Sequence, residues 1–299
     1  MERMISAPGA RIYCKVIGSG PPLLLLHGGP GADHTDFLPF LRPLSRTRTL
    51  ILIDERGSGR SERLTDPKKY TLEAMVEDVD TVRKALGFKR VDLLGHSFGG
   101  ILAQAYAIRH PRRVRHLILA GTAGSARTIN AEFRRMRARL APAVRKRLGQ
   151  FERRGIFGSD GRYVPAYARL CARIYAPYTY RRKVRVTKPA DYVSGWEVLR
   201  QMWVRRTDFK IEGNLRGFDF TRALRSVTAP ALVVIGDHDM VSPATARKLA
   251  SALPHAQLEV MRDCGHMMFV DDPAGFRSLV KSFTRKSSAS GRGARRPFR

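Results

Sequence analysis

The sequence predicts an α/β protein whose mostly parallel central sheet is covered by helices on both faces. Two observations predict this class: short apolar runs recur along the chain, and segments with helical spacing separate them. A run that is apolar at every position is typical of a strand buried on both faces, as in a parallel sheet. A length of 299 residues with 43% hydrophobic residues is ample for one large core.

The expected strands and helices alternate up to residue 120 and again after residue 230. Residues 71–86 illustrate the helical pattern, because their apolar side chains form one stripe and Gly87 follows as a stop signal. The expected strands are residues 11–17, 23–26, 49–53, 91–94, 114–120, 231–235 and 258–260. The expected core helices are residues 71–86, 99–109, 243–253 and 273–283.

Near Gly121 the alternation stops and a long basic segment begins. Residues 127–188 have helical character and carry far more Lys and Arg than acidic residues. We therefore expect a core formed by residues 1–124 and 223–284, interrupted by a helical insertion over 125–222. Residues 285–299 are rich in Gly, Ser and Arg, and we expect them to form a disordered basic tail.

Composition also excludes several classes of protein. No apolar run reaches the ~20 residues of a membrane-spanning helix, and the first residues show no secretory signal. The three cysteines lie far apart, with neither metal-ligand spacing nor a disulfide pattern. A reducing cytoplasm is therefore the expected location.

The strongest local signal is a G-x-S-x-G motif at residues 95–99, between an expected strand and an expected helix. Such a tight strand-to-helix turn requires small residues on both sides and exposes the Ser97 hydroxyl at the carboxyl edge of the sheet. The helix that follows presents free N–H groups at its first turn. The motif predicts Ser97 as a nucleophile.

A serine hydroxyl needs a general base, and the base needs a carboxylate to orient it. His266 follows the last expected strand and is the expected base, whereas His255 precedes that strand and so belongs to the opposite edge. Asp237 and Asp239 both follow the strand at 231–235, and Asp239 is favoured because the chain has turned toward the site there. Asp237 remains the alternative acid. If it is not the acid, its expected role is that of a turn residue that caps its own backbone.

An acyl-transfer intermediate also needs N–H donors for its oxyanion. One expected donor is the N–H of Phe98, directly after the nucleophile. The other is the N–H of Gly29, in the glycine-rich loop at residues 27–31 that follows an expected strand. Glycines in this loop let the backbone approach a substrate closely.

These motifs resemble the α/β-hydrolase superfamily and, within it, the proline iminopeptidase group of serine peptidases. The resemblance is carried by HGGPG at 27–31, DERGSGRS at 54–61, GHSFGG at 95–100, GDHD at 236–239 and GH at 265–266. It implies an α/β-hydrolase fold with a helical cap inserted after the sixth core strand. It also implies that the loop at 54–61 supports the site without taking part in the chemistry.

The resemblance further implies acidic side chains near the cap that hold the free α-ammonium of the substrate. In one branch of the group these acids lie in the cap exit and directly after the triad acid, where this chain has Asp208 and the uncharged Met240. Glu197 follows Trp196, as in the cap of other members, and is a second candidate; its alternative role is a solvent-facing helix residue. Asp208 and Glu197 are thus the expected substrate-binding residues.

The resulting prediction is a serine hydrolase, a proline iminopeptidase-like aminopeptidase that acts on short peptides and needs no metal or organic cofactor. The alternative is a carboxylesterase- or lactonase-like enzyme acting on small esters, since esters need no ammonium site. The net charge of +29 keeps a third, remote alternative, a polyanion-binding protein on a hydrolase scaffold. No nucleic-acid module accompanies the charge, so we expect only weak, salt-sensitive adhesion to polyanions. The sequence carries no signal of oligomeric state.

Overall fold

The structure is a computed structural model that describes residues 1–182 and 194–289. Within them, eight strands form one sheet in the order β1-β2-β4-β3-β5-β6-β7-β8. β2 is antiparallel to β1 and β4, and the other neighbours are parallel. The predicted fold class is confirmed. The strands are β1 (Glu2–Ala7), β2 (Ala10–Ile17), β3 (Pro22–Leu26), β4 (Thr49–Ile53), β5 (Val91–His96), β6 (Val114–Ala120), β7 (Ala231–Gly236) and β8 (Ala256–Met261).

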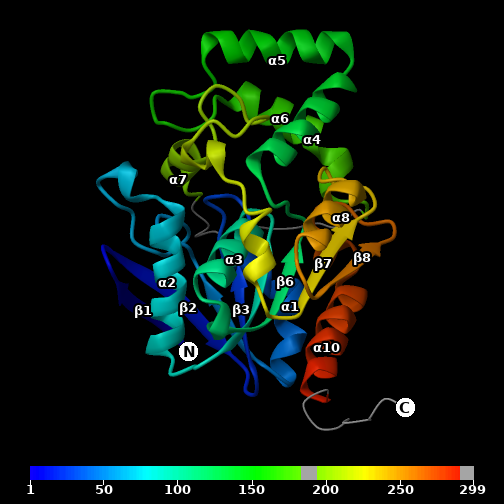
Figure 1. Cartoon of the computed structure of the whole chain (residues 1–299). Coiled ribbons are helices and arrows are strands. Elements are labelled where there is room, and N and C mark those ends of the chain that lie inside the picture. The colour runs from blue at the N-terminus through cyan, green and yellow to red at the C-terminus, as the bar shows by residue number, and fades with distance from the viewer. Residues whose placement is uncertain (183–193, 290–299) are drawn as a thin grey trace.

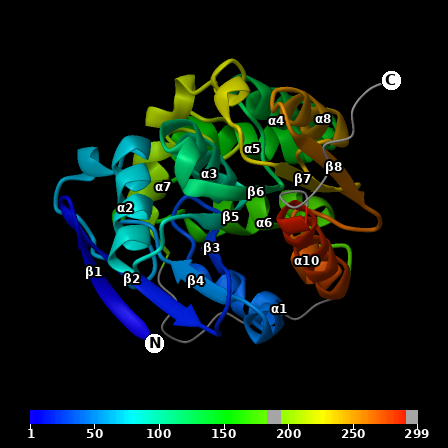
Figure 2. The same cartoon turned by 60° about the horizontal axis from the view of Figure 1, so that its bottom comes forward.

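Helices cover both faces of the sheet, as Figures 1 and 2 show. Leu24 and Leu26 of β3 pack in the layer that contains α2, α3 and α8, whereas Leu23 and Leu25 pack in the layer of α1, α9 and α10. Because successive side chains of a strand point to opposite faces, both layers require apolar residues and the run is continuous. The core helices are α1 (Leu38–Leu41), α2 (Leu72–Ala85), α3 (Phe98–Arg109), α8 (Pro243–Ser251), α9 (Met268–Asp271) and α10 (Pro273–Ala289).

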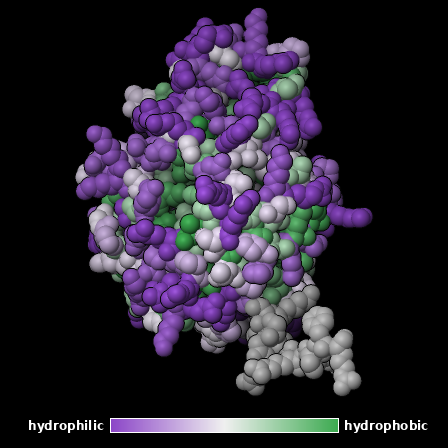
Figure 3. Space-filling view, in the orientation of Figure 1, coloured by the Kyte–Doolittle hydropathy of each residue, from purple (hydrophilic) through white to green (hydrophobic). Residues whose placement is uncertain are grey.

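Four helices between β6 and β7 stand above the carboxyl ends of the parallel strands (Figure 1). They lie within the insertion predicted for 125–222, of which residues 183–193 are outside the described residues. Hydrophilic side chains dominate the cap surface in Figure 3. The cap helices are α4 (Ala126–Ala138), α5 (Pro142–Arg154), α6 (Pro165–Thr179) and α7 (Trp196–Met202).

Both ends of the described chain differ from expectation. β1 was not expected, because Ile5 is the only buried residue of this edge strand. α10 continues past residue 283 to Ala289, so the predicted tail is helical over its first residues, and 290–299 lie outside the described residues. None of the described helices is long and apolar enough to cross a membrane. The three cysteines are buried and form no disulfide.

Candidate active site

Ser97 occupies the sharp turn between β5 and α3. Its backbone has φ +53° and ψ −117°, a conformation that a side-chain-bearing residue adopts only under strain. The flanking glycines make this turn possible: a Cβ on Gly95 would lie 2.2 Å from the Gly99 carbonyl oxygen, and one on Gly99 would lie 2.2 Å from the Leu26 carbonyl oxygen. The turn therefore requires the glycine–serine–glycine spacing that the sequence shows.

His266 and Asp239 are brought together beside this turn. His266 Nδ1 lies 2.9 Å from Asp239 Oδ1, which also accepts the Val241 N–H at 2.8 Å. Because a carboxylate can only accept, Nδ1 carries the proton and Nε2 is left as the basic nitrogen. Ser97 and His266 line the same cavity. His255, the rival base, precedes β8, whose amino end is the opposite edge of the sheet.

Two residues that the sequence did not single out hold this pair in place. The buried His96 lies with its Nε2 2.9 Å from the His266 carbonyl oxygen, and the two rings are 4.7 Å apart. Burial, with the nearby His266, lowers the pKa of His96 to about 3, so its imidazole stays neutral and donates this hydrogen bond. Gly121, at φ +58°, leaves room for the pair, because a Cβ there would lie 3.0 Å from His266 Nδ1 and 3.1 Å from Asp239 Oδ2.

The glycine-rich loop after β3 lies against the nucleophile. A Cβ on Gly28 would lie 3.5 Å from the Ser97 Cβ. Gly29 has φ +117°, and a Cβ on it would lie 2.6 Å from the backbone nitrogen of Gly31. Phe98 is the first residue of α3, so its N–H has no acceptor within the helix. The two expected oxyanion donors therefore lie on segments that flank Ser97.

A buried ion pair anchors this loop to the loop after β4. His27 Nδ1 donates to the Gly28 carbonyl oxygen at 2.8 Å, and His27 Nε2 lies 2.5 Å from Glu55 Oε2. Burial opposes a charge on His27, but Glu55 outweighs it and raises the pKa of His27 to about 9. Burial raises the pKa of Glu55 to about 7, although His27 acts in the opposite direction. Arg56 makes two 2.7 Å hydrogen bonds to Asp78, as a supporting loop would require.

The cavity over Ser97 is small and mostly apolar. Its volume of about 40 Å³ is far below the ~300–1,000 Å³ of small-ligand pockets, so side chains of the cap have to shift to admit a substrate. The described residues that line it are Ser97, Ile101, Gly121, Thr122, Ile129, Glu132, Phe133, Trp203, Met240, Val241 and His266.

Glu132 is the only carboxylate among these described lining residues, and the sequence did not mark it as functional. It projects from α4 and accepts hydrogen bonds from the hydroxyls of Ser242, at 2.6 Å, and Thr245. Burial alone would raise its pKa, but these hydrogen bonds and Arg135, 3.1 Å away, hold the pKa of Glu132 below its usual value. An ionised carboxylate therefore lines the cavity.

The two expected substrate-binding acids do not line this cavity. The half-buried Asp208 accepts a 2.7 Å hydrogen bond from the Tyr163 hydroxyl, and burial raises the pKa of Asp208. The exposed Glu197 lines a separate hollow of about 460 Å³ with Arg200 and Arg205. The cavity instead contains Met240, at the position that the resemblance associates with an acid.

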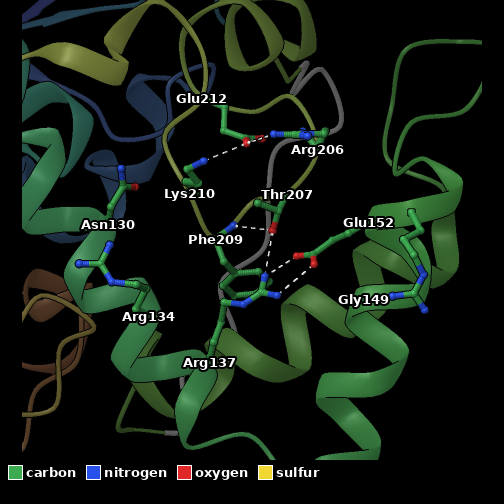
Figure 4. Close-up of a pocket in the computed structure, with 11 residues that line it drawn as sticks. Asn130, Arg134, Arg137, Gly149, Glu152, Arg206, Thr207, Phe209, Lys210 and Glu212 are labelled. Atoms are coloured by element: carbon green, nitrogen blue, oxygen red, sulfur yellow. Dashed lines mark hydrogen bonds and ion pairs between the residues drawn. The ribbon is translucent and has the colours of Figure 1, made fainter.

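Another hollow of about 460 Å³ lies in the cap between α4, α5 and the loop 206–212 (Figure 4). Its two carboxylates are both engaged: Glu152 pairs with Arg137, and Glu212 lies 3.3 Å from Arg206 and 3.4 Å from Lys210. None of the expected catalytic side chains lines it. These two hollows of the cap are therefore separate from the cavity at Ser97.

Comparison with known proteins agrees with this architecture. The sequence profile of the family described as alpha/beta hydrolase fold matches residues 21–273. A proline iminopeptidase of Lactobacillus delbrueckii subsp. lactis is 30% identical over 298 residues, which cover 94% of this chain and 97% of the relative. A proline iminopeptidase of Heyndrickxia coagulans is 28% identical over 285 residues, covering 94% of this chain and 98% of the relative.

Solved structures show the same likeness. The crystal structure of the proline iminopeptidase of Mycobacterium smegmatis superposes with a TM-score of 0.82 at 25% identity, covering 98% of this chain and all of the other. The crystal structure of VinJ superposes with a TM-score of 0.84, also at 25% identity, covering 96% of this chain and 98% of the other.

Proposed function

The chain belongs to the α/β-hydrolase fold family, and we propose that it is a serine aminopeptidase that releases N-terminal residues, proline foremost, from short peptides. One observation carries the proposal: His266, bonded to Asp239 at 2.9 Å, lines the same cavity as Ser97 together with side chains of the cap helix α4. The likeness to proline iminopeptidases over 94% of the chain supports the choice of substrate.

In the proposed reaction, His266 Nε2 takes the proton of the Ser97 hydroxyl while Asp239 stabilises the imidazolium that forms. The Ser97 oxygen attacks the carbonyl carbon, and the N–H groups of Gly29 and Phe98 hold the oxyanion. His266 then gives its proton to the leaving amine, which departs and leaves an acyl-serine. A water molecule, deprotonated by His266, hydrolyses the acyl-serine and restores the enzyme. These steps use side chains and water, so we expect no metal or organic cofactor.

An N-terminal substrate brings a positive charge into the cavity, and such a charge needs a carboxylate partner there. Glu132 meets this requirement, because it is ionised and lines the cavity with Ser97. We therefore place the substrate ammonium at Glu132. Asp208 and Glu197 remain predicted partners, and both can act only after a rearrangement that brings them to the cavity.

A second candidate activity is hydrolysis of small esters. The observation in its favour is the apolar lining of the cavity, including Met240, Phe133 and Trp203. An ester of a small acid needs no ammonium partner, and an apolar wall suits its acyl group. The two candidates share the same nucleophile and differ only in what the cavity recognises.

A rate comparison on three substrates tests the proposal. The substrates are a proline amide with a fluorescent leaving group, the same amide with its amine acetylated, and a short-chain nitrophenyl ester. Fast turnover of the free-amine amide alone supports the aminopeptidase. A fast ester with both amides slow would replace it by the esterase. The Ser97→Ala variant is the control, and turnover retained in that variant would contradict the acyl-serine mechanism itself.

The remaining expectations concern the surroundings of the enzyme. We propose a cytoplasmic location, which the buried, unpaired cysteines suit, since they need no oxidising compartment. We also propose that adhesion to nucleic acid is weak and lost at physiological salt. Retention of the protein on a DNA resin during a salt gradient tests the second proposal, and elution well above physiological salt would contradict it.

A further inference from the structure

A hollow lined by several charged side chains lies at the sheet edge opposite Ser97, where β5 and β6 begin; Figure 2 turns this edge toward the viewer. Its volume is about 330 Å³. The residues that matter to the argument are Arg48, Arg90, Asp92, Arg115, His116 and Thr284. Neither the resemblance nor the proposed mechanism uses any of them.

The one carboxylate of this hollow is fully engaged. Asp92 Oδ1 accepts hydrogen bonds from Arg115 Nε at 2.7 Å and from His116 Nδ1 at 2.6 Å. Asp92 Oδ2 accepts from Arg48 Nη1 at 2.5 Å and from Arg115 Nη2 at 3.0 Å. Burial would raise the pKa of Asp92, but these bonds lower it to about 2, so the group supplies one full negative charge.

Positive charge exceeds this negative charge. Three guanidinium groups line the hollow against one carboxylate, and the Arg48 side chain is only 8% exposed. Arg48 and Arg115 have Asp92 as their carboxylate partner, and in the part of the chain that the structure describes none of the three arginines pairs with another carboxylate. Arg48 and Arg115 share Asp92, and Arg90 is exposed, so the surplus positive charge faces solvent and attracts an anion from it.

Hydrogen-bond donors are also in excess. Each guanidinium has five N–H groups, of which Arg90 uses one on the Val114 carbonyl oxygen at 2.9 Å. Among the described residues Arg48 donates to Asp92 and Thr284, which leaves three of its five N–H groups unused. The hollow thus combines surplus positive charge with unused guanidinium N–H donors.

We propose that this hollow binds a phosphate-type oxyanion, either free or as the end group of a small phosphomonoester. The forked guanidinium groups of Arg48, Arg90 and Arg115 suit the several oxygens of such an anion. A divalent charge offsets the excess of three arginines over one carboxylate. The volume lies in the range of small-ligand sites, and the enclosure around Arg48 favours a small anion over a polynucleotide strand.

Isothermal titration calorimetry at pH 7 and constant ionic strength tests the proposal on the full chain. Inorganic phosphate and glycerol 2-phosphate are the ligands, and a short DNA duplex is the polyanion comparison. We expect saturable binding of at least one phosphate ligand, weakened tenfold or more by Arg90→Gln and by Arg115→Gln. The tighter of the two phosphate ligands identifies the free or the esterified source.

Arg134→Gln is the matched control, because it removes the same charge from the basic hollow of the cap shown in Figure 4. Phosphate affinity unchanged in this variant supports the proposal. An equal loss in Arg134→Gln, binding of the DNA duplex alone, or the absence of saturable phosphate binding would overturn it. Arg115 holds Asp92, so if Arg115→Gln does not fold, Arg90→Gln decides, since Arg90 makes no bond to Asp92.

Discussion

The bond between Asp239 and His266 gives the sharpest test of the proposed chemistry. Asp239→Asn keeps the shape of the side chain and removes its negative charge. In the structure one oxygen, Oδ1, accepts both the Val241 N–H and His266 Nδ1–H, while Oδ2 is buried and has no hydrogen-bond partner among the described residues. The amide that replaces the carboxylate can keep the first two contacts only by burying an unsatisfied NH₂ group in the place of Oδ2. The alternative flip turns the NH₂ toward His266 and imposes the wrong tautomer.

The magnitude follows from the distance. At 2.9 Å and an effective dielectric constant of ~20, the carboxylate stabilises the His266 imidazolium by about 6 kcal/mol. Because each 1.36 kcal/mol of transition-state stabilisation corresponds to a factor of ten, we expect kcat to fall by about 10⁴-fold in Asp239→Asn. The wrong tautomer gives a loss of the same order, about 10⁴-fold, in a triad of this kind.

The assay is release of the leaving group from the best of the three substrates, with thermal unfolding as a check that the variant is folded. Asp237→Asn is the matched control, because Asp237 is the alternative acid on the same loop; it accepts the Cys264 N–H at 3.2 Å and lies 3.9 Å from His238 Nε2, away from His266. We expect that control to retain activity within a few-fold of the parent. A folded Asp239→Asn variant within tenfold of the parent, or an equal loss in Asp237→Asn, would refute the reasoning.

Three further predictions concern groups around the site. Glu132→Gln should lower kcat/KM for the free-amine amide by about 10- to 100-fold and leave the nitrophenyl ester unchanged, since an ion pair is lost; equal losses on both substrates would indicate a purely structural role. Gly121→Ala should cost about 1–3 kcal/mol of stability and reduce kcat, because φ is +58° and the added Cβ would press on His266; chemical denaturation and the rate assay measure these, and an unchanged rate would contradict the contact. The raised pKa values of His27 and Glu55 mean that the folded state binds more protons than the unfolded state, so the free energy of unfolding falls as the pH rises from about 5 to about 9. That fall should be smaller in Glu55→Gln. Chemical denaturation at several pH values measures it, and the same pH dependence of the free energy of unfolding in parent and variant would contradict the coupling of His27 to Glu55.

The sequence allowed the parallel part of the sheet to be predicted because burial on both faces leaves a direct mark. Every residue of β3 and of β5 is buried, and the β3 run is apolar throughout. β1 leaves no such mark, because five of its six residues remain at least partly exposed and its pairing with β2 relies on backbone hydrogen bonds. The end of α10 was predicted too early. The residues after 283 are polar and carry no apolar stripe, yet the helix continues to Ala289.

Site residues at the ends of buried strands could be predicted, whereas a site residue on a cap helix could not. Ser97, Asp239 and His266 each follow the carboxyl end of a parallel strand, and such ends converge at one edge whatever the details of packing. The position of Glu132 depends instead on how α4 packs over that edge, and the hydroxyls of Ser242 and Thr245 that hold it come from a distant segment. In the sequence it is one of few acids in a basic helical stretch, which resembles a solvated face.

The cap meets the glycine-rich loop at residues 27–31 through a backbone contact that leaves no room for a side chain. The Gly195 N–H, just before α7, donates to the Gly31 carbonyl oxygen at 2.7 Å, and a Cβ on Gly31 would lie 2.5 Å from the Gly195 carbonyl oxygen. A Cβ on Gly195 would also lie 2.8 Å from the Gly57 carbonyl oxygen, in the loop after β4. The cavity over Ser97, of about 40 Å³, is small for a substrate, and residues of the cap line it. A displacement of Gly195 would therefore break a bond to the loop that carries the Gly29 N–H, so the position of the cap and that of the expected oxyanion donor are linked.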